Sequence, residues 1–368
     1  MAEPGAQGET ESPLWKAVGR PRSVIEVGAG SGDAGAIARQ KGATVFGVEP
    51  ADEAVKRLGH QRFDSMLLAD TVVRGGNGEA LLPKLVGLLD DGGHVVAHGS
   101  MDAREWEALL GRAGVDALWS ARERGTTIVV GRRPPAKRKL SLTVGMISMN
   151  EEKAVGPVID DIKARAPEAQ VLLVDSSKDK TPQIAEERGA RVVRQFPPRG
   201  YGPAMDRLLY ETTTDVIITM DCDGTYPADR ILELHRYVED GADLVNATRT
   251  RRRPGAMPFA NYLANRVFAE AAHVLHGTPT TDVHSGMRAY RTSMLRGFHV
   301  DPKGPALPVE LLIVPARQGY KIIEVGIAYH ERVGNTTLHR FDSTVWTFKR
   351  LLRARAGSRV RSKRFEVV

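Results

Sequence analysis

Cysteines, aromatic residues and long apolar runs are all scarce in this chain of 368 residues. No apolar run approaches the roughly 20 residues that a membrane-spanning helix needs, so the sequence predicts no such helix. The single cysteine, Cys222, excludes a disulfide within the chain and favours a reducing, cytoplasmic compartment. Residues 1–20 lack the basic start of a secretory signal. Aromatic residues make up 6%, and no nucleic-acid-binding motif accompanies the net charge of +7, so nucleic acid is the least favoured partner.

Strands and helices alternate along two blocks of the sequence, which predicts two α/β domains built on doubly wound sheets. A loose leader is expected at residues 1–20, and the first block covers residues 21–133. The basic, proline-bearing stretch 134–139 indicates a linker. The second block covers residues 140–356, and a basic tail follows at 357–368.

The most informative stretch is Asp221-Cys222-Asp223-Gly224, which follows the apolar run 216–220. That run indicates a buried strand, and side chains two residues apart share one face of a strand. Two carboxylates at its end can therefore bind one divalent cation, which usually keeps waters and takes phosphate oxygens as its other ligands. The pattern predicts a site for Mg²⁺ or Mn²⁺ and a diphosphate, although a turn with two solvated aspartates has the same sequence.

Other polar groups of the second block are expected to line up at the ends of strands, where open α/β sheets bind ligands. They are Asn150, Glu151, Asp175, Arg199, Gly200, the stretch 280–288 and the stretch 329–337.

In this order, the motifs of residues 140–355 resemble a family 2 glycosyltransferase of the GT-A fold, nearest to its dolichol-phosphate mannose synthase-like branch. The resemblance implies that Asp221 and Asp223 hold the metal and the donor diphosphate. It implies that Asp282 lies near the acceptor, and that Arg288 and Arg332 gather phosphate oxygens as part of the catalytic set.

The resemblance also assigns residues to the donor nucleotide. It implies that Asn150, Glu151 and Asp175 hold the base and ribose. Arg199 and Gly200 match a loop over the donor. Family 2 enzymes characteristically invert the anomeric carbon, which implies a single in-line displacement with a nucleotide-diphosphate sugar as donor.

The nature of the acceptor stays open at this point. A hydroxyl acceptor needs a base, and Asp282 is the better-placed carboxylate, whereas a phosphate acceptor is already ionised and needs none. Relatives of the branch often carry membrane helices and a glutamine where this chain has Thr225. Residues 349–364 hold eight cations and no acid, which fits either a peripheral membrane contact or an ordinary solvated helix end.

The first block contains a glycine-rich loop between a predicted strand and a predicted helix. It resembles a truncated class I S-adenosylmethionine-dependent methyltransferase, in which the matching residues are expected to bind the cofactor. These residues are Glu26, Gly28, Gly30, Gly32 and Glu49. Because a third strand is missing or abbreviated, we expect this Rossmann-like domain to be structural.

Alternatives remain open for both blocks. The first could be a dinucleotide-binding domain, or an active methyltransferase in a bifunctional enzyme that methylates and glycosylates a small molecule. A non-catalytic scaffold with two nucleotide folds is a further alternative, and the retained charged groups of the second block count against it.

Overall fold

The computed structural model describes residues 12–28, 32–49, 51–75, 77–252, 259–304, 306–331, 340–354 and 365–367. The chain divides into two compact units, which we describe separately. The first comprises Met1–Ala136, Ser293–His299 and Gly357–Arg361; the second comprises Lys137–Thr292, Val300–Ala356 and Ser362–Val368. The division after Ala136 falls inside the stretch from which a linker is predicted, whereas the membership of Ser293–His299 in the first unit has no signal in the sequence.

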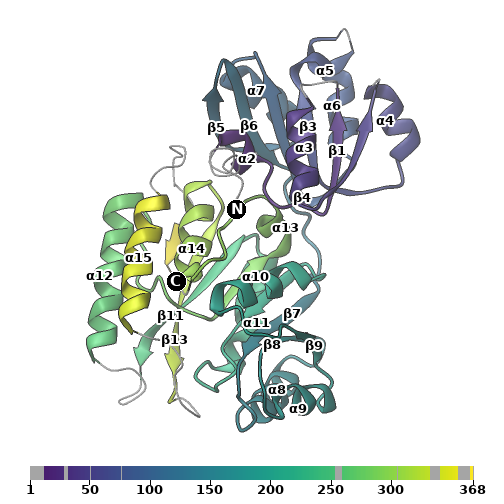
Figure 1. The fold of residues 1–368 in the computed structure, drawn as a ribbon. Helices are drawn as coiled ribbons and strands as arrows, with labels where there is room; N and C mark the ends of the chain where they lie inside the picture. Colours follow the sequence, from purple (N-terminus) through teal and green to yellow (C-terminus); the bar gives the residue numbers. More distant parts are fainter. Residues whose placement is uncertain are drawn as a thin grey trace, which may run out of the picture. The chain divides into compact units, whose positions relative to one another are not determined.

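The first unit contains a six-stranded sheet in the order β2-β1-β3-β4-β6-β5 (Figure 1). Neighbouring strands among β1 to β4 pair in parallel, and β6 lies antiparallel between β4 and β5. The strands are β1 (Ser23–Val27), β2 (Thr44–Val48), β3 (Phe63–Ala69), β4 (Leu89–Gly99), β5 (Asp116–Glu123) and β6 (Thr126–Arg132). The helices are α2 (Pro13–Ala17), α3 (Asp33–Gln40), α4 (Ala51–Leu58), α5 (Asp70–Arg74), α6 (Gly78–Val86) and α7 (Ala103–Arg112).

The predicted loose leader is wrong for residues 12–20, because this segment packs onto the first unit. The Ser12 side chain accepts a hydrogen bond from the backbone N–H of Trp15 and so caps α2. Trp15 is buried, and the ammonium group of Lys41 lies 4.4 Å from the centre of its ring. Lys41 also donates to the carbonyl oxygen of Gly19 at 2.8 Å. One buried tryptophan and one capping serine are enough to order a segment whose composition looks flexible.

The second unit contains an eight-stranded mixed sheet in the order β14-β13-β11-β12-β10-β7-β8-β9. Its strands are β7 (Leu142–Ser148), β8 (Gln170–Asp175), β9 (Arg191–Arg194), β10 (Val216–Thr219), β11 (Leu244–Arg252), β12 (Arg288–Arg291), β13 (Ile322–Tyr329) and β14 (Phe365–Val367). Its helical elements are α8 (Val155–Arg165), α9 (Thr181–Glu187), α10 (Tyr201–Glu211), η1 (Ala228–Arg230), α11 (Ile231–Glu239), α12 (Phe259–His276), α14 (Leu307–Arg317) and α15 (Arg340–Ala354). The short α13 (Thr292–Arg296) follows β12.

Strand β12 changes the predicted architecture of this unit. A doubly wound sheet is predicted for this block, and strands of such sheets run mostly parallel, but β12 runs antiparallel to both of its neighbours, β10 and β11. Thr219, at the end of β10, pairs with Arg288, at the start of β12. The loop that precedes β12 therefore lies at the same sheet edge as the residues that follow β10. This arrangement brings two polar segments, about 60 residues apart in the sequence, to one place.

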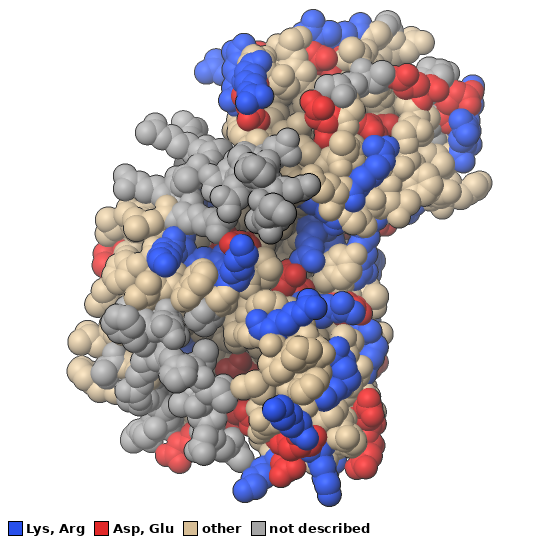
Figure 2. Space-filling model, viewed as in Figure 1, with Lys and Arg blue, Asp and Glu red and all other residues tan. Residues whose placement is uncertain are grey.

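Among the described residues, no helix is long and apolar enough to cross a membrane. On the face shown in Figure 2, basic and acidic side chains are interspersed, so the positive net charge is not gathered there into a single basic patch.

Candidate functional site

The segment Asp221-Cys222-Asp223 leaves the end of β10 with its side chains alternating. Cys222 points into the hydrophobic core of the second unit. Burial raises the pKa of its thiol, so Cys222 is not an activated nucleophile. Asp221 is partly exposed, and Asp223 is buried. Gly224 follows with φ of 77°, a left-handed conformation that suits glycine and turns the chain.

Asp223 is held in place by a residue two positions further along. Its Oδ1 accepts hydrogen bonds from the backbone N–H of Thr225 at 3.0 Å and from the Thr225 hydroxyl at 2.6 Å. The carbonyl oxygen of Thr225 in turn accepts from the backbone N–H of His330, just after β13. Thr225 thus fixes the orientation of the buried carboxylate.

Asp221 lies against the loop that precedes β12. A Cβ atom on Gly286 would come within 2.9 Å of Asp221 Oδ1, so a side chain at position 286 would displace the carboxylate. The backbone N–H of Gly286 donates to the Tyr226 hydroxyl at 2.7 Å. Burial raises the pKa of Tyr226, and the charge of Asp221 adds to the rise, so the phenol stays neutral beside the carboxylate.

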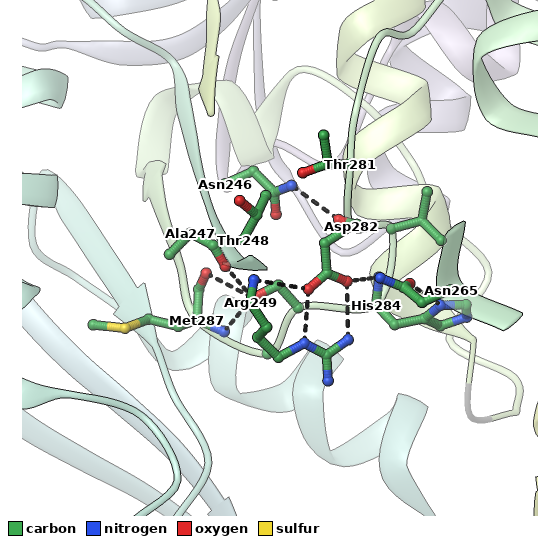
Figure 3. A network of polar contacts seen from close by, with 12 residues as sticks. Asn246, Ala247, Thr248, Arg249, Asn265, Thr281, Asp282, His284 and Met287 are labelled. Atoms are coloured by element: carbon green, nitrogen blue, oxygen red, sulfur yellow. Dashed lines mark hydrogen bonds and ion pairs between the residues drawn. The ribbon is translucent and has the colours of Figure 1, made fainter. Parts of the chain in front are cut away.

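Asp282 forms a buried ion pair with Arg249, a residue that the sequence analysis did not single out (Figure 3). Arg249 Nε donates to Asp282 Oδ2 at 2.7 Å, and Nη2 donates to Oδ1 at 2.9 Å. Burial raises the pKa of Asp282, but the Arg249 charge and hydrogen bonds outweigh it and hold the pKa well below its usual range. The pairing of β11 with β13 shifts register between Thr248 and Arg251, a β-bulge of the kind that redirects side chains.

His284 connects the Asp282 loop to two helices. Its backbone N–H donates to Asp282 Oδ1 at 3.0 Å. Its ring nitrogens lie 3.1 Å from Asn265 Oδ1 on α12 and 2.8 Å from Thr347 Oγ1 on α15. The ring of Phe268 meets the imidazole edge-on. Burial lowers the pKa of His284 to about 4, so a neutral imidazole bridges the two helices. Since Asn265 Oδ1 can only accept, the proton is assigned to Nδ1.

The prediction that Arg288 gathers phosphate oxygens does not fit its position. Arg288 is fully buried at the start of β12. Its guanidinium donates to Asn246 Oδ1 at 2.8 Å and to the carbonyl oxygens of Pro308 and Val283. Asn246 donates from its amide to the carbonyl oxygen of Asp282 at 2.9 Å. The guanidinium of Arg288 thus donates its hydrogen bonds to acceptors within the protein, and it stabilises the Asp282 loop through Asn246 and Val283.

A buried carboxylate, Glu324 on β13, supports the same loop and was also missed. Its Oε1 accepts from the backbone N–H of Thr281 at 3.0 Å, and its Oε2 accepts from the Thr280 hydroxyl at 2.7 Å. Burial raises the pKa of Glu324, and these hydrogen bonds oppose the rise. The sequence does contain a signal for Glu324, Asn246 and Arg249, since the apolar patterns at residues 243–247 and 321–329 indicate strands and these polar residues lie in or just after them.

Asp175, predicted to hold the donor nucleotide, is fully buried at the end of β8. Its carboxylate accepts from the hydroxyl of Ser148 at 2.7 Å and from the backbone N–H of Ser177 at 3.1 Å. It also forms an ion pair with Arg194, whose guanidinium donates to the Ser177 carbonyl oxygen at 2.8 Å. In this arrangement Asp175 organises the loop after β8, and a direct contact with a nucleotide would require that network to open.

Asn150 and Glu151 lie beside that loop. Asn150 is exposed with φ of 61°, and its side-chain oxygen accepts from the backbone N–H of Lys178 at 2.9 Å. Its own backbone N–H donates to Ser177 Oγ at 2.7 Å. Glu151 is partly exposed, and its backbone N–H donates to Thr181 Oγ1 at 2.9 Å. The structure therefore brings the predicted nucleotide residues together at the ends of β7 and β8.

Two further predicted site residues lie on loops. Arg199 is exposed, and Gly200 begins α10 as its N-cap with φ of 94° and nothing within 4 Å of an added Cβ. Arg332 lies outside the described residues, as does most of the polar stretch 329–337.

In the first unit, the glycine-rich loop after β1 is partly described, with Gly30 outside the described residues. Gly28 has φ of 86°, and an added Cβ would come within 2.4 Å of the Val72 side chain. The close contact that requires a glycine at position 28 is therefore with the protein's own Val72 side chain. Gly32 also has positive φ, 73°, but faces open space, and Glu49 is exposed beyond β2.

The carboxylate of Glu26 packs against helix α3. A Cβ on Gly35 of α3 would come within 2.2 Å of Glu26 Oε2, so the carboxylate covers the first turns of α3. This packing accounts for a glutamate at position 26 and a glycine at position 35 without a bound ligand. The resemblance of residues 21–133 to a methyltransferase stays a prediction, as do the cofactor contacts of its five residues.

The donor set at Asp221 and Asp223 fits a hard divalent cation. Two carboxylates stand two residues apart at a strand end, and one is oriented by Thr225. Within the described parts of the chain, no group of three or more His, Cys, Asp or Glu side chains forms a closed metal site. A cation held by these two aspartates would keep coordination positions for substrate oxygens.

Comparison with known proteins places the second unit in a family. Residues 143–298 match the model of "Glycosyl transferase family 2". The dolichyl-phosphate hexose transferase of Haloferax volcanii is 40% identical over 201 residues, which cover 54% of this chain and 87% of that protein. The undecaprenyl-phosphate mannosyltransferase of Micrococcus luteus is 32% identical over 200 residues, covering 50% of this chain and 81% of that protein. A crystal structure of M. tuberculosis glucosyl-3-phosphoglycerate synthase superposes with a TM-score of 0.47 at 25% identity, covering 61% of this chain and 84% of that one. The chain belongs to glycosyltransferase family 2, with a GT-A fold in its second unit, and is a hexosyltransferase.

Proposed function

We propose that this enzyme transfers a hexose from a nucleotide-diphosphate sugar to a polyprenyl phosphate, with inversion and with Mg²⁺ or Mn²⁺. The observation that carries the proposal is the pairing of two sites at one sheet edge. Asp221 and Asp223 form an acidic site after β10, and Asp282, bound to Arg249, lies in the loop that precedes β12. The names of the relatives from Haloferax volcanii and Micrococcus luteus supply the lipid-phosphate class.

The state of Asp282 favours a phosphate acceptor over a hydroxyl. A general base needs a pKa near the working pH and an oxygen directed at the acceptor proton. Both Asp282 oxygens accept from Arg249, and the pKa of this carboxyl is lowered. An acceptor that is already ionised needs no base, so the Arg249–Asp282 pair can serve to position and charge-balance the acceptor.

Asp221 and Asp223 would hold the cation. When bound, the cation neutralises the charge that develops on the leaving diphosphate. The protein's own contribution is orientation, since Thr225 fixes Asp223 and Gly286 leaves room for Asp221. Asn150 and Glu151, which both follow β7, are proposed to line the nucleotide side, with Arg199 and Gly200 over the donor. Arg332 is proposed to approach the phosphates.

A transfer assay tests this proposal. Purified enzyme is incubated with UDP-, GDP- or dTDP-hexose and undecaprenyl or dolichyl phosphate in detergent, with Mn²⁺ or with EDTA. We expect one donor to give a lipid-linked hexose of inverted configuration by NMR, and EDTA or the Asp223→Ala change to abolish it. Undiminished transfer by Asp223→Ala in EDTA would exclude metal dependence. Transfer to small hydroxyl compounds alone would exclude the phosphate acceptor.

For the first unit we propose a supporting role without methyl transfer. The packing of Gly28 against Val72 and of Glu26 over Gly35 supports this role. Calorimetry of the whole chain with S-adenosylmethionine should give no binding heat. Binding that disappears in Glu26→Gln would overturn the proposal and favour the bifunctional alternative.

A further inference from the structure

We propose that β2 of the first unit is a dimerisation strand, which pairs antiparallel with β2 of a second copy of this chain. Among the described residues, β2 (Thr44–Val48) has one strand neighbour, β1, and lies at the edge of the six-stranded sheet. The inference goes beyond the proposed transfer reaction. It gives the supporting role proposed for the first unit a concrete form, namely the association of two transferase chains.

The sheet ends at β2 because the chain supplies no further strand on that side. Between Val48 and Phe63 the described residues form α4, and the next strand, β3, pairs with the other side of β1. In the common order of doubly wound sheets, a third strand covers the outer side of the second. Strand β2 nevertheless has the composition of an interior strand. Val45, Phe46 and Val48 are three of its five residues, and it contains no charge and no proline.

The backbone of β2 presents hydrogen-bonding groups on its open side. Thr44 donates its N–H to the Arg22 carbonyl oxygen at 2.8 Å, toward β1. The backbone groups of successive strand residues point to opposite sides in the plane of the sheet. Val45 and Gly47 therefore direct their N–H and C=O groups away from β1. A row of such groups on an edge strand is a template for pairing with another chain.

The opposite edge of the same sheet, β5, carries the features that prevent such pairing. It contains the charged residues Asp116, Arg122 and Glu123, and its pairing with β6 shifts register between Ala117 and Trp119. Charges and bulges of this kind keep an edge strand from pairing with another chain. Association is therefore expected through β2 alone, and a strand that pairs with its own copy gives a closed dimer.

Charge and register identify the occupant of this edge as a second copy. Arg39, exposed at the end of α3, precedes β2, and Glu49, also exposed, directly follows it. An antiparallel pair of β2 strands brings the basic end of each strand to the acidic end of the other, which favours self-association.

One register uses all the outward backbone groups of β2. When Phe46 lies opposite its own copy, Val45 lies opposite Gly47 of the second copy, and these two residues exchange hydrogen bonds. The two Phe46 side chains, each 37% exposed in the single chain, then form an aromatic cross-strand pair. We expect this register, with the two-fold axis at Phe46.

Sedimentation velocity of the full chain tests the dimer over concentrations of about 1–100 µM. The test variant is Gly47→Pro, because proline removes the outward N–H and is accepted in an edge strand when that N–H faces solvent. The matched control is Gly47→Ala, which keeps the N–H. Nothing lies within 4 Å of a Cβ added at position 47, so both side chains have room.

We expect the parent to shift from the mass of one chain toward the mass of two as its concentration rises. Gly47→Pro should raise the dissociation constant about tenfold or more, because each copy loses a backbone hydrogen bond and the proline ring obstructs the facing strand. Gly47→Ala should associate as the parent does. A parent that stays at the mass of one chain would overturn the proposal, and so would a dimer of equal stability in the two variants.

Charged residues at position 46 test the register. Phe46→Lys and Phe46→Glu each place like charges opposite one another, so each variant alone should be monomeric. A mixture of the two should form a heterodimer, measured by capture of the untagged variant on the tagged one. Circular dichroism melting checks that both variants are folded. Folded variants that do not capture one another would refute an antiparallel pair centred on Phe46.

Separate observations distinguish failure of this inference from failure of the supporting role. S-adenosylmethionine binding by a chain that still dimerises through β2 would reject the supporting role and keep the dimerisation strand. A monomeric parent that binds no S-adenosylmethionine would reject the dimerisation strand and leave the supporting role. Hexose transfer is measured independently of both.

Discussion

Replacing Arg249 by methionine should destabilise the second unit strongly, because it leaves the Asp282 charge buried without its partner. The Asp282 side chain is 2% exposed and that of Arg249 is 13% exposed. Breaking a buried ion pair on one side costs about 3–5 kcal/mol, and two charge-assisted hydrogen bonds are lost here. We therefore expect the free energy of unfolding to fall by about 3 kcal/mol or more at neutral pH.

Removing the other partner should cost less. In Asp282→Leu, the guanidinium of Arg249 keeps its contact with the Tyr329 ring, at 5.4 Å, and its partial exposure to water. The double variant Arg249→Met/Asp282→Leu leaves no unpaired charge buried. It should therefore be more stable than Arg249→Met alone, with a coupling energy on the order of 0.5–3 kcal/mol.

Urea unfolding provides the assay. Trp346 is the single tryptophan of the second unit's sequence, so the difference in fluorescence between each chain and its Trp346→Phe form follows that unit. A loss below about 0.5 kcal/mol for Arg249→Met, the range of ordinary surface changes, would refute the buried-pair reasoning.

The pH dependence of the unfolding free energy provides a second check, because it should have opposite signs in the parent and in Arg249→Met. In the parent, the pKa of Asp282 is lowered on folding, so its contribution is present above pH 3.8 and is lost only on further acidification. In Arg249→Met, burial should raise that pKa above the unfolded value. The variant should then gain stability as the pH is lowered from 7 toward the usual pKa range of carboxyl groups. A fall in its unfolding free energy over that pH interval would contradict the reasoning.

Three more predictions concern single side chains. Thr225→Val should raise the Mn²⁺ concentration needed for half-maximal transfer about tenfold or more, because a hydrogen bond to a charged group contributes about 1.5–3 kcal/mol. Thr225→Ser keeps the hydroxyl and should need the same Mn²⁺ concentration as the parent. Equal Mn²⁺ requirements of the two variants would reject the orienting role of Thr225. Burial raises the pKa of Asp215, but hydrogen bonds from Arg138 and Ser141 outweigh it and lower the pKa from 3.8 to about 2, so unfolding free energy should decline as pH falls between these values. Asp215→Asn should flatten that decline, and an unchanged slope would show that the pair does not persist in solution. The pKa of His284 is lowered to about 4 by burial, so its ring resonances should not titrate between pH 5 and 8; a midpoint near the usual 6.5 would place the ring in contact with water.

The sequence predicted most of the strands and helices, but not their arrangement. The apolar run before Asp221 and the alternation around Cys222 gave β10 and its acidic end. Strand β5 was missed, and so was β12, which is four residues long and contains two buried arginines, Arg288 and Arg291, so that its composition does not indicate a strand. The leader at 12–20 was misassigned because a single tryptophan packs it.

The roles of charged residues were harder to predict than their location. Asp175 ends β8 and Asp282 lies in the loop before β12, but each carboxylate is bound to an arginine, Arg194 and Arg249 respectively, that the sequence analysis did not pair with it. Arg288 was expected to face a phosphate and instead binds carbonyl oxygens in the protein interior. The roles expected for Arg332 and Gly30 stay predictions.

By itself, the sequence determined which segments alternate as strand and helix and which polar residues stand at strand ends, because those features follow from local periodicity along the chain. The tertiary structure alone decided which of those residues meet. An antiparallel β12 and a register shift in β11 bring Arg249 to Asp282 and direct Arg288 inward. Such pairings join residues more than 30 positions apart and depend on sheet order, which short-range patterns do not specify.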